Sequence, residues 1–353
     1  MARLRLGHLT RRDILAAGAW AGAGMALGRA VTATAAEQGL ITKAIPSTGE
    51  RLPVIGIGTN SFSDSQLPAL TALLKRMQQL GGKLIDTAAA YGESEGVIGS
   101  ALAQLGVRDR MFIATKLTNG GGMRMGPPPG AGGAGGPPGG GPPGGGPGGG
   151  GPGGPPGGGR RGPELAGKAS LEHSLQQLKA KSIDLLQVHN LNGIDALFPQ
   201  MQEWKKAGLI RYIGMTTSNP EQHDDMVTYM KKYPVDFVEV DYSIAERSAA
   251  STVLPVARER GIAVIADVPL GGRGGRNISA VRGQPLPAWA ADTGASSWAQ
   301  LLLKYVVSHP DVTAAIPGST QISHMEDNQG AGRGRLLDED QRKRLEQYWD
   351  KLA

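Results

Sequence analysis

The chain has 353 residues, of which 55 are glycine, 24 are proline and none is cysteine. The absence of cysteine excludes disulfides, thiolate catalysis and thiol-based metal sites. The formal net charge of +6 does not support nucleic-acid binding, because the first 36 residues contribute five arginines against one aspartate. The rest of the chain has no basic stripe interleaved with aromatic residues, so we expect no nucleic-acid partner.

Residues 1–36 have the organisation of an export signal. The pair Arg11-Arg12 precedes a mildly apolar run at residues 15–27, and small residues at 33–36 provide acceptable cleavage sites. The run is short and rich in glycine and alanine, so we expect no stable membrane span, which needs about 20 apolar residues. The alternative is an N-terminal helix with an incidental arginine pair. The order of the regions favours the twin-arginine export machinery, and we predict a periplasmic protein.

Residues 40–353 are predicted to form one domain in which short apolar strands alternate with amphipathic helices. Residues 40–45 and 52–57 are expected to pair as a hairpin that closes the floor of a barrel or leads into its first strand. The predicted strands are residues 52–57, 83–86, 111–116, 183–189, 210–216, 235–240, 262–267 and 312–316. The predicted helices are residues 66–80, 94–105, 167–180, 197–207, 220–232, 245–260, 295–307 and 338–352. Strict alternation implies a parallel sheet, and eight units imply closure, so the predicted fold is α/β, a (β/α)8 TIM barrel.

One segment interrupts this pattern after the third predicted strand. Residues 126–159 contain only glycine and proline apart from Ala131 and Ala134. They offer no side chains that could be buried to offset the entropy of ordering, so we predict a disordered low-complexity insert within the barrel. Stretches of this insert match the glycine spacing of phosphate-binding loops through composition alone. They are not a phosphate-binding fingerprint, because no strand directly precedes them and no helix directly follows. The alternative role is a gate or partner tether at the mouth of the barrel.

Four polar residues stand at or just after the ends of predicted strands. Asp86, Lys116 and His189 end the second, third and fourth strands, and Tyr91 follows Asp86 by five residues. The carboxyl ends of parallel strands share one rim, so we expect these four side chains to converge there. No histidine pair or closely spaced carboxylate pair ends a strand, and we predict no metal site.

These four residue types suggest a specific chemistry. A nearby ammonium lowers the pKa of a phenol, and an aspartate keeps that lysine charged and aimed. The imidazole of His189 can orient a carbonyl oxygen or share in the proton transfer. Such a site protonates an oxygen that is gaining charge. Because it has no obvious nucleophile or metal, the electrons should come from a cofactor, most simply as hydride.

The same residues belong to motifs that resemble the aldo-keto reductase superfamily, in order and from about residue 52 to the C-terminus. The motifs are DTAAAYGESE at 86–95, ATK at 114–116, IDLLQVH at 183–189, IGMTTS at 213–218, IPGST at 316–320 and EDN at 326–328. The resemblance implies a (β/α)8 barrel that reduces an aldehyde or ketone with a nicotinamide cofactor, or runs the reverse reaction. It also implies that Tyr91 is the general acid, Lys116 lowers its pKa, Asp86 holds Lys116, and His189 orients the carbonyl.

The resemblance further implies which residues contact the cofactor: Thr216, Thr217, Glu239, Leu270, Gly271, Gly318, Ser319, Thr320, His324 and Asn328. Several positions depart from the family pattern. Glu239 stands where relatives commonly have glutamine, and Asp267 where many stack a tyrosine on the nicotinamide ring. Gly318 and His324 replace a lysine and an arginine. We expect NADP(H) ahead of NAD(H), with the choice left open by these two replacements.

Two functions therefore follow from the sequence. The first is an exported NAD(P)H-dependent reductase of a small carbonyl compound. The second is a catalytically weak nucleotide-binding or regulatory protein on the same fold, which the residues at 239 and 267 favour slightly. The sequence identifies neither the physiological substrate nor the oligomeric state.

Overall fold

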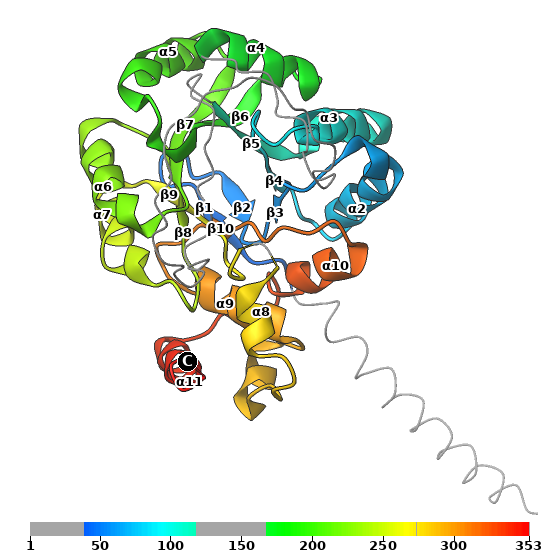
Figure 1. Ribbon diagram of the computed structural model, residues 1–353, viewed down its shortest axis with the longest axis vertical. Helices are drawn as coiled ribbons and strands as arrows, with labels where there is room; N and C mark the ends of the chain where they lie inside the picture. The colour runs from blue at the N-terminus through cyan, green and yellow to red at the C-terminus, as the bar shows by residue number, and fades with distance from the viewer. Residues whose placement is uncertain (1–38, 118–166, 273, 353) are drawn as a thin grey trace, which may run out of the picture.

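Eight parallel strands form a sheet that closes on itself in the computed structural model (Figure 1). The strands are β3 (Ile57–Gly58), β4 (Leu84–Asp86), β5 (Phe112–Leu117), β6 (Ile183–Val188), β7 (Ile210–Thr217), β8 (Phe237–Asp241), β9 (Ala263–Asp267) and β10 (Ala314–Ala315). Each strand is hydrogen-bonded to its neighbour in chain order. Parallel bridges from Ile55 to Ala315 and from Gly58 to Gly318 join the first strand to the last. The predicted (β/α)8 barrel is therefore confirmed.

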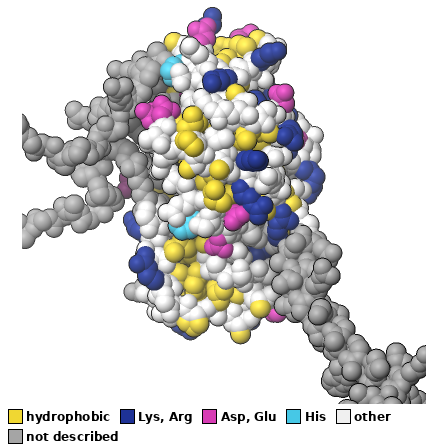
Figure 2. All heavy atoms as spheres, turned by 90° about the vertical axis from the view of Figure 1, so that its right-hand side faces the viewer, with side chains coloured by type: hydrophobic (Ala, Val, Ile, Leu, Met, Phe, Trp, Pro, Cys, Tyr) yellow, Lys and Arg dark blue, Asp and Glu magenta, His cyan; other side chains and the backbone are white. Residues whose placement is uncertain are grey.

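The structure describes residues 39–117, 167–272 and 274–352. The predicted signal peptide and the predicted insert at 126–159 lie outside these residues. Within them, no helix combines the length and the apolar character needed to cross a bilayer. On the face shown in Figure 2, lysine and arginine side chains lie among acidic, apolar and other residues.

Helices surround the strands (Figure 1). They are α2 (Leu67–Gln79), α3 (Ser94–Leu105), α4 (Gly167–Gln177), α5 (Ile194–Lys206), α6 (His223–Lys232), α7 (Val253–Arg260), α8 (Arg276–Ala280), α9 (Trp298–Val307), α10 (Ile322–Gly330) and α11 (Glu339–Trp349). Short 3-10 turns are η1 (Asp64–Gln66), η2 (Arg108–Arg110), η3 (His189–Leu191), η4 (Pro220–Gln222), η5 (Ser248–Ala250) and η6 (Ala288–Thr293). The sequence did not predict α8 or α10, and the helix predicted at 245–260 forms only from Val253 onward.

The predicted hairpin fulfils both of its expected roles. Strands β1 (Thr42–Ala44) and β2 (Arg51–Pro53) pair antiparallel, and the chain then continues into β3. The hairpin residues Ile45 and Leu52 are fully buried and belong to an apolar cluster with Phe112, Leu185 and Phe237 from the strands. This cluster fills the barrel interior, so the hairpin closes the floor and the opposite end is left for a site.

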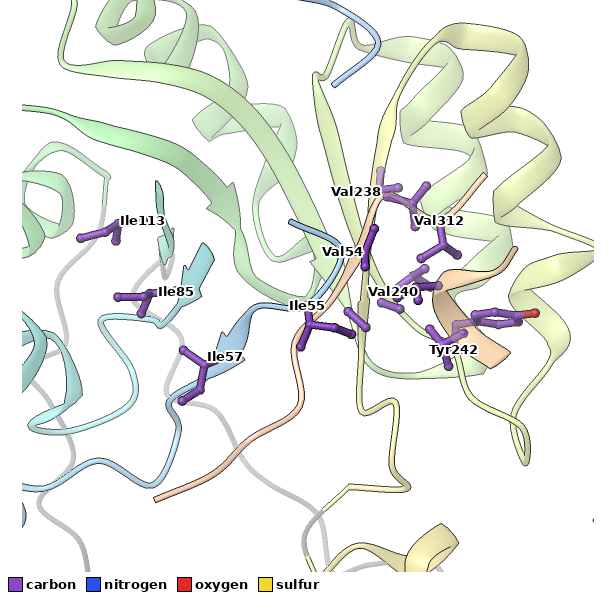
Figure 3. Close-up of a cluster of buried hydrophobic side chains, with 14 of the residues drawn as sticks. Val54, Ile55, Ile57, Ile85, Ile113, Val238, Val240, Tyr242 and Val312 are labelled. Carbon is purple, nitrogen blue, oxygen red and sulfur yellow. The ribbon is translucent and has the colours of Figure 1, made fainter. Parts of the chain in front are cut away.

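A second apolar core lies between the strands and the helices. Ile57, Ile85 and Ile113 are adjacent in register on β3, β4 and β5, and Figure 3 shows them side by side. Helix packing outside this core is close at Gly99 of α3. A Cβ placed there would lie 2.1 Å from the carbonyl oxygen of Gln177, the last residue of α4. This contact is possible only because residue 99 has no side chain.

Candidate functional site

A buried ion cluster lies at the carboxyl ends of the strands. Lys116 Nζ is 2.5 Å from both carboxylate oxygens of Asp86 on β4 and 3.2 Å from Oε1 of Glu239 on β8. It also donates to the carbonyl oxygen of Thr87 at 3.1 Å. All three ammonium hydrogens are thereby used. Gln187 on β6 donates to the other Glu239 oxygen at 2.7 Å, which fixes this carboxylate from a third strand.

Tyr91 is positioned over this cluster by a set of buried hydroxyl groups. Ser94 Oγ is 2.9 Å from Thr87 Oγ1 and 2.8 Å from Thr59 Oγ1, and Thr59 donates to the carbonyl oxygen of Asp86 at 2.8 Å. These bonds tie the 87–94 turn to the end of β4. Lys116 Nζ lies 5.4 Å from the centre of the Tyr91 ring. Ser94 is the first residue of α3, as the predicted range 94–105 implies, and its hydroxyl belongs to this network and does not cap the helix.

His189 completes the group of four predicted catalytic residues. Its ring makes an edge-to-face contact with Tyr91, with ring centres 5.8 Å apart. Burial, and then the charge of Lys116, lowers the pKa of His189 to about 3, so the imidazole is neutral at physiological pH. Asn190 and Leu191, which follow it, both have positive φ (52° and 58°), an uncommon conformation for residues other than glycine. The structure therefore brings Asp86, Tyr91, Lys116 and His189 together.

The electrostatics of Tyr91 differ from the simple expectation of a lowered pKa. Burial raises the pKa of the phenol; the Lys116 ammonium lowers it, but Asp86 and Glu239 raise it again, and the net shift is upward. For Lys116, burial alone would lower the pKa, yet the same two carboxylates raise it above its ordinary value, which keeps the ammonium charged. The Tyr91 phenol is therefore protonated at neutral pH.

A cavity of about 900 Å³ opens beside Tyr91. Most of the residues predicted to contact the cofactor line it: Glu239, Leu270, Gly318, Ser319, Thr320, His324 and Asn328. The other three predicted cofactor contacts, Thr216, Thr217 and Gly271, are not part of the cavity lining. The Thr216 hydroxyl accepts a hydrogen bond from the Asn190 backbone, and the Thr217 hydroxyl donates to the side chain of Gln222. In the loop after β9, the neighbouring Gly272 lines the cavity and Gly271 does not.

The cavity lining combines an acidic group with a helix N-terminus. Beside Tyr91 the wall carries the carboxyl groups of Asp86, Glu239 and Asp267. Ser319 and Thr320, which also line the cavity, precede α10, and the backbone N–H groups of a helix's first turn favour an anion. This size and polarity fit a nicotinamide dinucleotide.

Sequence reasoning missed several residues of the site. Gln187 is the clearest, although a glutamine inside the buried strand 183–189 is an unusual choice that could have drawn attention to it. Ser218, Phe62, Arg282 and Trp298 also line the cavity. Phe62, Arg282 and Trp298 come from loops and a helix end that carry no motif, whereas Ser218 ends the motif at 213–218 and could have been named from it. Among the described residues, no group of three or more histidine, aspartate or glutamate side chains is arranged to hold a metal ion.

Comparison with known proteins shows independently which family the chain resembles. A model of the Aldo/keto reductase family matches residues 54–350. The chain is similar to Aldo-keto reductase YhdN of Bacillus subtilis (26% identical over 232 residues) and to an uncharacterized oxidoreductase, C215.11c, of Schizosaccharomyces pombe (29% identical over 272 residues). The first alignment spans 63% of this chain and 59% of the relative; the second spans 74% and 72%.

Solved structures with the same fold include aldo-keto reductase AKR11C1 from Bacillus halodurans in its holo form. It is 22% identical with a TM-score of 0.62, and the match covers 89% of this chain and 97% of that one. Another is an aldo/keto reductase from Klebsiella pneumoniae in complex with NADP and acetate, 22% identical with a TM-score of 0.60, covering 85% and 93%. At such identity the likeness establishes the fold alone.

Proposed function

Because the chain belongs to the aldo/keto reductase family, we propose that it reduces an aldehyde or ketone to an alcohol with a nicotinamide cofactor, and that the same site can run the reverse reaction. The observation that carries this proposal is the arrangement of Tyr91. Its phenol faces the cavity, contacts His189 through its ring and stands over the buried Lys116–Asp86 pair. A proton donor in this position acts on an oxygen that gains negative charge.

The roles follow from the geometry and charges. Tyr91 gives its proton to the carbonyl oxygen, and neutral His189 offers a ring N–H that can orient the same oxygen. Lys116 supplies a fixed positive charge that stabilises the phenolate left behind, and Asp86 holds the ammonium in place at 2.5 Å. When bound, the reduced nicotinamide supplies the hydride.

We propose NADP(H) as the preferred cofactor. Two features support this: the relative of known structure from Klebsiella pneumoniae is in complex with NADP, and the exposed Arg282 lines the cavity together with His324. A cation in the cavity lining can pair with a 2′-phosphate, and one such charge-assisted contact contributes about 1.5–3 kcal/mol. The substrate proposed is a small carbonyl compound.

The substitution Tyr91→Phe tests the catalytic assignment. It removes the hydroxyl and keeps the ring against His189, so kcat for a reactive test aldehyde should fall by roughly 10²-fold or more while nucleotide affinity is unchanged. Tyr348→Phe is a matched control, because this phenol lies on α11 outside the main cavity. Equal turnover by Tyr91→Phe and the wild-type protein would remove Tyr91 from the mechanism.

A second candidate function is a weakly catalytic nucleotide-binding or regulatory protein. The raised pKa of Tyr91, caused first by burial and then by the carboxyl groups around Lys116, favours it. The same experiment separates the two. A wild-type protein that binds nucleotide but turns over slowly, at a rate that Tyr91→Phe leaves unchanged, would support the second function.

We further propose export to the periplasm through the arginine pair near the N-terminus.

A further inference from the structure

The acidic end of the cavity holds more carboxyl groups than its one lysine can pair. Lys116 directs its three hydrogens to Asp86, to Glu239 and to the carbonyl oxygen of Thr87. No ammonium hydrogen is left for Asp267, the last residue of β9, which lines the same cavity. The Oδ1 atom of Asp267 is buried and has no hydrogen-bond partner among the described residues.

Strand β8, which is next to β9, does not supply a counter-charge to Asp267 either. Asp267 is in register with Asp241 on β8, and the Oδ1 atom of Asp241 is 2.9 Å from Nε2 of His223; neither of these two partners lines the cavity. The charged groups that act on Asp267 are therefore Glu239, Asp241 and Asp86, which are acidic, and Lys116, which is already paired. A buried polar atom without a partner is unfavourable, and a proton or a cationic ligand at this carboxyl group would relieve it.

The proposed function identifies that ligand group, and the inference rests on it. Hydride must reach the carbonyl carbon whose oxygen is protonated by Tyr91, so the nicotinamide ring has to lie at the Tyr91 end, where Asp267 and Glu239 form the wall. A nicotinamide ring is cationic when oxidised and neutral when reduced. We propose that Asp267, together with Glu239, makes this pocket bind the oxidised cofactor more tightly than the reduced one.

The protonation of Asp267 is consistent with this preference. Burial, followed by the charges of Glu239 and Asp241, raises its pKa well above the ordinary value, with Lys116 opposing the shift. The raised pKa favours the neutral carboxyl group when the neighbouring ring is uncharged, and a cationic ring would favour the carboxylate, whose proton would pass to solvent through the cavity. A nicotinamide ring held here would become cationic next to Asp267 on giving up hydride, and Tyr91 would carry negative charge after protonating the carbonyl oxygen. The acidic wall therefore favours reduction of the carbonyl and slows release of the oxidised cofactor.

Dissociation constants for NADP⁺ and NADPH, measured by calorimetry on the full-length protein, test this proposal. We expect the wild-type protein to bind NADP⁺ about tenfold more tightly, which corresponds to about 1.4 kcal/mol. Asp267→Asn removes the charge at nearly constant shape and should bring the two constants within about twofold. The fragment 2′-phospho-ADP-ribose lacks the ring, so its affinity should not change. Asp327→Asn, at a lining residue that is bonded to Ser297 and Gln300, should change the affinity for both nucleotides by the same factor.

Each outcome is decisive. Equal affinity for the two nucleotides, or tighter binding of NADPH, in the wild-type protein overturns the inference and leaves the proposed function intact. An unchanged ratio in Asp267→Asn overturns the assignment to Asp267. If that variant does not fold, the ratio of the two dissociation constants in the wild-type protein still decides whether the pocket prefers the oxidised cofactor. Failure of all three ligands to bind the wild-type protein overturns the proposed function and the inference together.

Discussion

Two glycines of α3 allow a sharp test of how the helix shell is packed. Gly96 and Gly99 are one turn apart, and in a helix interior a change from glycine to alanine stabilises by about 0.5–1 kcal/mol. At Gly96 the new Cβ would meet only the side-chain oxygen of Gln177 at 2.9 Å, a group that can rotate away. At Gly99 it would lie 2.1 Å from the Gln177 carbonyl oxygen and 2.8 Å from the Leu178 backbone, which cannot rotate away.

We therefore expect opposite signs from the same substitution. Overpacking costs about 1–3 kcal/mol, and the rigid contact places Gly99→Ala at the upper end, for a net loss of about 2 kcal/mol. In a domain of this size that corresponds to a melting temperature lower by about 4–8 °C. Gly96→Ala should be neutral or slightly stabilising. Urea unfolding of both variants, followed by circular dichroism, measures the difference. If Gly99→Ala proves as stable as Gly96→Ala, the close approach of α3 and α4 is wrong.

Two further predictions concern the site and the N-terminus. The pKa of His189 is about 3 in the folded protein against 6.5 ordinarily, so the unfolded chain binds the extra proton between these values. The neutral, buried ring thus contributes stability above pH 6.5 that is lost as the pH falls toward 3. Proton NMR of His189 should show no titration from pH 8 to pH 5, and a midpoint near 6.5 would contradict the buried geometry. For export, changing Arg11 and Arg12 to lysine should leave precursor in the cytoplasm. Equal processing of this variant and the wild-type protein, seen by fractionation and intact mass, would refute a twin-arginine route.

The sequence was sufficient for the barrel because its strands are short apolar runs with clear breaks between them. The convergence of Asp86, Lys116 and His189 could also be predicted, because they stand at the ends of neighbouring parallel strands, and parallel strands end on one rim. Helices α8 and α10 were missed for a physical reason. Each is nine residues or fewer and glycine-containing sequence adjoins each, so neither presents an extended apolar stripe.

The ion pair between Lys116 and Glu239 could not be predicted in the same way. These residues come from β5 and β8, which are not neighbours in the sheet, and they meet only because the sheet closes. Glu239 entered the sequence-based prediction as a cofactor contact through resemblance alone. Its pairing with Lys116, and the resulting isolation of Asp267, depend on distances across the barrel mouth that no local pattern encodes.

The way the barrel closes also determines when folding can finish. Ile55 pairs with Ala315 and Gly58 with Gly318, so the last seam of the sheet joins segments from opposite ends of the domain. Such distant pairing incurs loop-closure entropy before any contact is gained, which slows folding. Until the residues of β10 have been synthesised, β3 has an unpaired edge, and an unpaired edge is a template for pairing with other chains. The interval between synthesis of β3 and of β10 is therefore the period of greatest exposure to aggregation.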